Sequence, residues 1–264
     1  MKSLVSTDWL EKNLRNVRVI DGTWHLPNIK LSAFDEFKKS HIKNAIFFDI
    51  DKNSNQNSNL PHMLPKKEDW EKIISELGIK NSDHIIIYDN SDVISSCRVW
   101  YTFLYFNHVL DGGFKKWLSE KKETTNDIKK FSKTSYSAEE NKTLVLNKNQ
   151  INDNIKSKTF ELVDARSKER FLGKQPETRK ELKSGNIEGS KNMPYTDLIN
   201  IDGTFKKKDE LMSIFEKNKI DPKKKIAFTC GSGITACVLG LTYSIIGGNK
   251  PVIYDGSWAE YGIK

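Results

Sequence analysis

The chain has 264 residues, of which 37% are hydrophobic, 10% aromatic and 30% charged. This length allows one large domain or two of ordinary size, and the hydrophobic content is sufficient for packed cores. The formal net charge is +8, but the lysines are scattered in short runs without interleaved aromatic residues or a nucleic-acid-binding motif. We therefore expect solvated surface lysines, with a mild attraction for anionic substrates, and no nucleic-acid partner.

The sequence also argues against secretion and membrane insertion. No apolar run approaches the length of a membrane-spanning helix, and residues 4–14 are typical of a folded element rather than of a signal peptide. Three cysteines in a chain of this length do not make a disulfide framework. We therefore expect a cytoplasmic protein in a reducing compartment, with no membrane partner.

In chain order, the first half alternates helices and strands. The buried run His84-Ile85-Ile86-Ile87-Tyr88-Asp89 is typical of a strand that is covered on both faces. The apolar spacing predicts a further strand and four helices, over 17–21, 6–13, 34–38, 68–77 and 97–106.

The second half repeats this pattern. Asp164, Asn186, Cys230 and Asp255 correspond to Asp21, His41, Asp89 and Asp111, at separations of 143, 145, 141 and 144 residues. Four landmarks at nearly one spacing predict duplicated domains, each with a mainly parallel sheet flanked by helices in an α/β fold. The expected domains are 1–120 and 148–264, joined by a polar connector over 121–147.

The segment Lys225-Ile226-Ala227-Phe228-Thr229-Cys230-Gly231-Ser232-Gly233-Ile234-Thr235-Ala236-Cys237 predicts a strand, a tight loop and a helix. Glycines allow successive backbone N–H groups to converge, and the start of a helix adds partial positive charge. A thiolate would be stabilised there, so Cys230 is expected to ionise more readily than a free cysteine. A buried cysteine at a strand end is the alternative. The first half carries Asp89 at the matching position, which cannot act as a sulfur nucleophile.

The chain resembles the tandem-domain rhodaneses over nearly its whole length, and most closely their 3-mercaptopyruvate sulfurtransferase subgroup. The motifs that carry the resemblance are the loop from Cys230 to Thr235 together with Phe47-Phe48-Asp49-Ile50-Asp51, His62-Met63-Leu64-Pro65, Ser190-Lys191-Asn192-Met193-Pro194 and Tyr254-Asp255-Gly256-Ser257-Trp258. The resemblance implies transfer of sulfane sulfur from 3-mercaptopyruvate to Cys230, giving a persulfide and pyruvate. A thiol acceptor such as thioredoxin or a small thiol, or cyanide, then takes the sulfur, without a metal or organic cofactor.

The resemblance also assigns site residues. Cys230 is the nucleophile, and Ser232 with His62 and Asp51 from the first domain would relay protons across an interdomain cleft. Arg170 and Arg179 would bind the donor carboxylate, because the planar guanidinium binds carboxylates through two hydrogen bonds. The backbone of the loop, at Gly231, Gly233, Ile234 and Thr235, would hold the anionic sulfur.

Two positions depart from the family pattern. Asn186 replaces a usual histidine, and Lys43-Asn44 replaces a usual Pro-Gly pair. We expect altered turns rather than lost activity. Cys97 is interpreted as a core residue and Cys237 as a packed helix cysteine rather than a resolving thiol.

Three alternatives remain. A phosphatase or arsenate reductase with a Cys-x5-Arg loop is disfavoured, because Ala236 stands at the arginine position. Thiosulfate sulfurtransferase activity is disfavoured by the uncharged Gly231-Ser232 pair. A sulfur carrier or binding module would have no need for the two arginines.

Overall fold

The computed structural model describes residues 3–103 and 107–264 and shows an α/β protein with two compact units. The first unit comprises Met1–Asn57, Leu64–Glu140 and Ile201–Thr204. The second comprises Ser58–Met63, Asn141–Asn200 and Phe205–Lys264. Two short segments therefore belong to a different unit from their neighbours in the sequence. One of them, Ser58–Met63, carries His62, which the sequence assigns to the first domain.

The first unit is built on a five-stranded parallel sheet with strand order β1-β6-β5-β2-β4. In the register of the sheet, Val19 on the interior strand β2 pairs with Ile86 of β5 on one side and Ala45 of β4 on the other. A separate antiparallel pair, β3 with β7, lies outside this sheet. The strands are β1 (Leu4–Val5), β2 (Arg18–Asp21), β3 (His41–Ile42), β4 (Ala45–Phe47), β5 (Ile85–Tyr88), β6 (Asn107–Leu110) and β7 (Thr124–Thr125).

The helices of the first unit cover both faces of this sheet. Leu10 and Trp117 pack with Ile86 in one buried cluster, while Val99 and Ile87 lie together beside Gly22. Ile86 and Ile87 are consecutive, and side chains of consecutive strand residues point to opposite faces, so the sheet is buried on both sides. The helices are α1 (Thr7–Asn13), α2 (Ala33–Lys39), α3 (Lys67–Glu76), α4 (Ser96–Phe103) and α5 (Gly113–Ser119). The helix predicted over 97–106 corresponds to α4, and residues 104–106 lie outside the described part.

The second unit repeats this topology, which confirms the duplication. Its five parallel strands have the order β10-β9-β11-β12-β8. Read from β8, this order matches the first sheet strand for strand, with β11 in the place of β5 and β9 in the place of β2. The strands are β8 (Val145–Leu146), β9 (Glu161–Asp164), β10 (Lys191–Asn192), β11 (Ile226–Thr229) and β12 (Val252–Tyr254).

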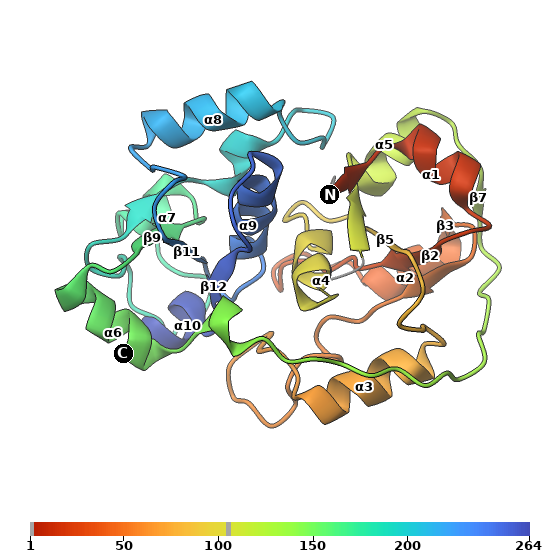
Figure 1. The fold of residues 1–264 in the computed structure, drawn as a ribbon, viewed down its shortest axis with the longest axis horizontal. Coiled ribbons are helices and arrows are strands. Elements are labelled where there is room, and N and C mark those ends of the chain that lie inside the picture. Colours follow the sequence, from red (N-terminus) through yellow and green to blue (C-terminus); the bar gives the residue numbers. More distant parts are fainter. Residues whose placement is uncertain (1–2, 104–106) are drawn as a thin grey trace. The chain divides into compact units, whose positions relative to one another are not determined.

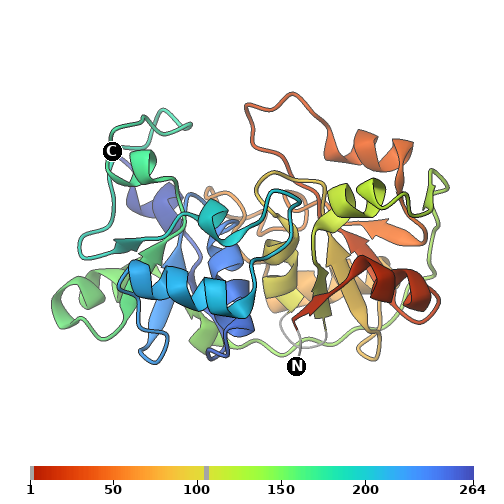
Figure 2. The same cartoon turned by 90° about the horizontal axis from the view of Figure 1, so that it is seen from above.

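Helices also cover both faces of the second sheet. Ala227 on β11 packs with Ile151 and Trp258 in one buried cluster, whereas the ring of its neighbour Phe228 lies 5.7 Å from that of Tyr243. Figure 1 shows α6 and α10 on one side of these strands and α8 and α9 on the other, and Figure 2 gives the view from above. The helices are η1 (Lys142–Leu144), α6 (Lys148–Ser157), α7 (Lys168–Phe171), η2 (Tyr195–Leu198), α8 (Lys208–Lys217), α9 (Ala236–Ile245) and α10 (Ser257–Tyr261).

The two departures from the family pattern are accommodated locally. His41 forms a hydrogen bond from Nδ1 to the Phe37 carbonyl oxygen at 2.7 Å. At the matching position of the repeat, the Asn186 side-chain amide donates to the Phe171 carbonyl oxygen at 3.0 Å. Asparagine therefore supplies the same bond to the end of the preceding helix. Asn44 adopts a φ of 64°, a left-handed conformation that asparagine tolerates better than most residues.

No helix among the described residues is long and apolar enough to cross a membrane.

Candidate active site

Cys230 lies directly after the last residue of β11, and its side chain is buried, with 1% of the residue exposed. Its backbone N–H donates to the Ser257 hydroxyl oxygen at 3.3 Å, and its carbonyl oxygen accepts from the Trp258 N–H at 3.0 Å. The Gly231 carbonyl oxygen accepts from the Ala259 N–H at 2.8 Å. The start of α10 therefore fixes the backbone on which the cysteine is carried.

The loop that follows Cys230 presents unused hydrogen-bond donors. Within the described residues, the backbone N–H groups of Gly231, Ser232, Ile234 and Thr235 have no acceptor. Gly233 adopts a φ of 80°, which reverses the chain before α9 begins and strongly favours glycine. Unpaired N–H groups beside the start of a ten-residue helix make this loop suitable for binding an anion.

Two further predicted residues meet in the second unit. The Nδ1 atom of His62 lies 2.9 Å from the Ser232 hydroxyl oxygen, and both residues are buried. His62 adopts a φ of 60°, an unusual conformation for a residue with a side chain. Asp51 belongs to the first unit, where its carboxylate accepts a hydrogen bond from the Trp24 indole N–H at 3.0 Å.

Arg170, at the end of the short helix α7, lies beside the cysteine loop. A Cβ atom added to Gly231 would lie 3.2 Å from the Arg170 Nη2 atom. The guanidinium also pairs with the Glu177 carboxylate, through Nη2 at 2.5 Å and Nε at 3.3 Å. The side chain of Arg170 is 25% exposed, whereas that of Glu177 is 1% exposed.

The sequence alone did not reveal the rest of this charge network. Arg166 pairs with Asp164 at 2.7 Å and with Glu177 at 2.8 Å, and it donates to the Gly185 carbonyl oxygen at 2.9 Å. Its guanidinium also lies 4.4 Å from the ring centre of Trp258. Burial opposes the charge on Arg166, but the two carboxylates outweigh it and raise the pKa of the guanidinium. Two carboxylates and two guanidinium groups thus run from the end of β9 to the cysteine loop.

Arg179 differs from Arg170, because its side chain has no hydrogen bond or ion pair within 3–103 and 107–264. It is half-buried, and its carbonyl oxygen accepts from the Leu182 N–H at 3.1 Å.

The other two cysteines are packed inside the protein. Cys237 is fully buried on α9, and its thiol donates to the Gly233 carbonyl oxygen at 3.1 Å. Cys97 is fully buried on α4. No cluster of three or more His, Cys, Asp or Glu side chains suited to a metal ion occurs in the described part of the chain.

Comparison with known proteins gives the family. The model of the rhodanese-like domain matches twice, at residues 6–120 and 147–264. The chain is 35% identical to mouse 3-mercaptopyruvate sulfurtransferase and 37% identical to bovine thiosulfate sulfurtransferase, in each case over 98% of this chain and 92% of the relative.

A solved structure agrees with these relatives. SseA from Escherichia coli, described as a 3-mercaptopyruvate sulfotransferase with a rhodanese fold, aligns with a TM-score of 0.89 at 29% identity. The alignment covers 98% of this chain and 99% of SseA. The family model matches in both halves of the chain, and the relatives align over nearly their full length. The chain therefore belongs to the rhodanese-like family and is a sulfurtransferase.

Proposed function

We propose that the protein takes sulfur from 3-mercaptopyruvate onto Cys230 and passes it to a thiol acceptor or to cyanide. The observation that carries this proposal is a buried cysteine at the start of a loop whose backbone N–H groups are unpaired among the described residues. A persulfide formed on Cys230 places a negative charge on its outer sulfur atom. The N–H groups of Gly231, Ser232, Ile234 and Thr235 would stabilise that charge, as an oxyanion hole does.

In the first step, the Cys230 thiolate attacks the sulfur atom of the donor. A sulfur–sulfur bond forms, and the carbon–sulfur bond of 3-mercaptopyruvate breaks with its electron pair moving to carbon. The proton from the donor thiol is transferred to that carbon, which gives pyruvate and an anionic Cys230 persulfide. In the second step, the thiolate of an acceptor attacks the outer sulfur atom and releases the Cys230 thiolate. One difficult transfer is thus divided into two easier ones.

Ser232 and His62 are suited to moving the proton in the first step. Their side chains are within hydrogen-bond distance of each other, at 2.9 Å, and Ser232 belongs to the cysteine loop. We assign these two residues the role of a proton relay.

The charge balance of the two predicted donor-binding arginines supports 3-mercaptopyruvate over thiosulfate. Arg170 can still donate a hydrogen bond to the donor, but Glu177 balances its charge, so Arg179 is the predicted donor-binding residue that adds net positive charge within the described part of the chain. No cationic side chain lies between Cys230 and Thr235. One uncompensated cation matches the single carboxylate of 3-mercaptopyruvate better than the two charges of thiosulfate. Thiosulfate remains the second candidate donor, because thiosulfate sulfurtransferases are among the relatives.

The remaining parts of the proposal concern acceptors and compartment. Thioredoxin or a small thiol would serve as acceptor, and the chemistry needs no metal or organic cofactor. Three free cysteines suit a reducing compartment such as the cytoplasm.

The test is the intact mass of the reduced protein after brief exposure to either donor, followed by peptide mapping. We expect one added sulfur atom on the Cys230 peptide, formed faster from 3-mercaptopyruvate. Faster loading from thiosulfate would move the assignment to thiosulfate sulfurtransferase. Absence of loading from both donors would contradict the enzyme mechanism and favour a binding module.

A further inference from the structure

A pocket with a volume of about 550 Å³ lies at the edge of the second sheet opposite to Cys230. Lys224 and Lys225, which line it, come directly before β11, whereas Cys230 comes directly after that strand. Glu161 lines the pocket as the first residue of the neighbouring parallel strand β9. Because strands β9 and β11 run in the same direction, the pocket and the cysteine loop lie at opposite ends of the same sheet.

The floor of this pocket is apolar. Ile151, Leu162 and Ile187 line it, and each is at most 4% exposed. They belong to the buried cluster that also contains Trp258, and Ile155 and Phe160 pack against that cluster while lining the pocket. A ligand that enters would therefore contact the partly exposed side chains of Ile155 and Phe160, which the covered residues beneath them hold in place.

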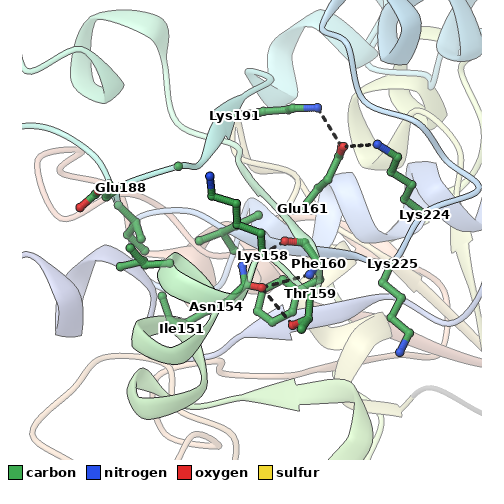
Figure 3. A pocket seen from close by; sticks show the side chains of 14 residues that line it. Ile151, Asn154, Lys158, Thr159, Phe160, Glu161, Glu188, Lys191, Lys224 and Lys225 are labelled. Carbon is green, nitrogen blue, oxygen red and sulfur yellow. Dashed lines mark hydrogen bonds and ion pairs between the residues drawn. The ribbon is translucent and has the colours of Figure 1, made fainter.

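Four lysines and two glutamates supply the charge around this floor. Lys191 and Lys224 share one carboxylate, that of Glu161, at 2.9 and 3.5 Å. Figure 3 shows these two ammonium groups converging on Glu161, while Lys158 and Lys225 extend away from that pair. Neither Lys158 nor Lys225 has a side-chain partner within the described residues. The carboxylate of Glu161 is therefore already used, and two cations remain uncompensated.

The loop that carries Lys158 is held in a defined position. Asn154 accepts a hydrogen bond from the Phe160 N–H and donates one to the Phe160 carbonyl oxygen, both at 3.0 Å. Lys158, the residue directly after α6, adopts a φ of 51°. Its backbone is thus positioned by the fold, and only its flexible side chain would have to be ordered when a ligand binds.

We propose that this pocket binds a small molecule with a carboxylate or phosphate group on an apolar body. The volume lies within the range of small-molecule sites, and an apolar floor with a few polar groups is typical of them. The apolar part would lie against the partly exposed Ile155 and Phe160, and the anionic group would pair with Lys158 or Lys225, whose side chains extend in different directions in Figure 3. This site is separate from the proposed sulfur donor site.

The test uses the full-length protein with labelled isoleucine and leucine methyl groups and follows their NMR signals. The probes are hexanoate, hexyl phosphate and hexanol, which share one chain and differ in charge. We expect the anions to shift the signal of Ile155 most strongly, and those of Ile151, Leu162 and Ile187 beneath it less, while that of Ile234, in the cysteine loop, stays in place. Comparison of hexanoate with hexyl phosphate shows which anionic group is preferred. If hexanol binds as tightly as both anions, or if the shifts centre on Ile234, the proposal is wrong.

Two double variants test whether the anion binds the lysines of the pocket or is attracted by the positive charge of the whole protein. The double substitution Lys158→Gln and Lys225→Gln removes both candidate partners and should weaken binding of the anionic probes by about 1.5- to 5-fold, the range for one exposed charge interaction. The control, Lys208→Gln with Lys217→Gln, removes the same charge from exposed positions on α8 outside the pocket. It should leave binding unchanged. Equal effects of the two double variants, or no effect of either, would overturn the assignment of the anion to this pocket.

Discussion

Replacing Glu177 by glutamine tests whether the buried charge network positions Arg170. The wild-type network holds Asp164, Arg166, Glu177 and Arg170, and its formal charges cancel. The substitution keeps the shape of the side chain and one acceptor oxygen but leaves a net positive charge around Arg166, whose side chain is 0% exposed.

The expected cost follows from this burial. Removing one partner of a buried ion pair destabilises a protein by about 3–5 kcal/mol, because the other charge stays buried without compensation. Glutamine can still accept from one guanidinium, so we expect a loss near the lower end, about 3 kcal/mol. Arg170 would also lose its carboxylate partner and its fixed place beside Gly231. Weakening one charge-assisted contact to the donor by about 1–2 kcal/mol lowers kcat/KM roughly 5- to 30-fold.

Urea unfolding measures the first effect, and kcat/KM for 3-mercaptopyruvate measures the second. The control is Glu181→Gln, because Glu181 is exposed and its side chain has no partner in the described part of the chain. Unchanged stability in Glu177→Gln would refute the energetic argument. Lower stability with unchanged kcat/KM would show that the network supports the fold without positioning Arg170.

Three further predictions concern the nucleophile, the loop and the pH dependence of stability. Cys230→Ser should abolish sulfur transfer while Cys97→Ser, which changes a fully buried residue on α4, should retain it; equal activity of the two would contradict the assignment. Gly231→Ala places a methyl group 3.2 Å from the Arg170 Nη2 atom. We expect kcat/KM to fall by about tenfold, because Arg170 must shift, while the urea midpoint stays near that of the wild type. Unchanged kinetics would mean that activity does not depend on the position of Arg170 beside Gly231. Burial raises the pKa of Asp21 from 3.8 to about 6, against the hydrogen bonds from Thr23 and Tyr88 that lower it. The folded protein therefore binds this proton more tightly than the unfolded chain, and the resulting stability is complete below pH 3.8 and is lost as the pH rises through about 6. Relative to Asp21→Asn, the wild type should lose about 3 kcal/mol of unfolding free energy across this window, as measured by urea titration; a constant difference would exclude the shift.

The sequence was most informative where the signal is local. The apolar run before Cys230 and the glycines after it predicted β11, the loop and α9, because strand burial and chain reversal depend on neighbouring residues. The repeat spacing predicted two equivalent sheets. The resemblance to the family named His62 and Ser232, but it did not reveal that the segment carrying His62 packs with the second compact unit. Which unit the segment Ser58–Met63 joins depends on tertiary packing.

The charge network was missed because its members have no periodic relation. Glu177 lies 11 residues after Arg166, in an irregular segment that folds back on the end of β9. A comparison of the two halves of the sequence does point to Arg166 as a member of this network. Thr23 stands two residues after Asp21, where the second half has Arg166 two residues after Asp164. Both carboxylates accept a hydrogen bond from the backbone N–H two residues later, but Asp21 also accepts from the Thr23 hydroxyl, whereas Asp164 pairs with the Arg166 guanidinium. The cation is therefore specific to the unit that carries the cysteine.

The loops at equivalent positions of the repeat satisfy their backbone donors in different ways. In the first unit, the Asp89 carboxylate accepts from the N–H groups of Ser91 at 2.9 Å and Ser96 at 2.8 Å. Burial raises the pKa of this carboxyl, although these bonds oppose the rise. In the second unit, Cys230 supplies no such acceptor, and loop N–H groups remain unpaired within the described residues. The first loop thus carries its own acceptor at this position, whereas the second leaves its N–H groups for the Cys230 thiolate and for the persulfide formed on it. The residue that follows the strand, Asp89 in the first unit and Cys230 in the second, therefore decides whether the loop N–H groups bind a side chain of the fold or stay available for a reacting group.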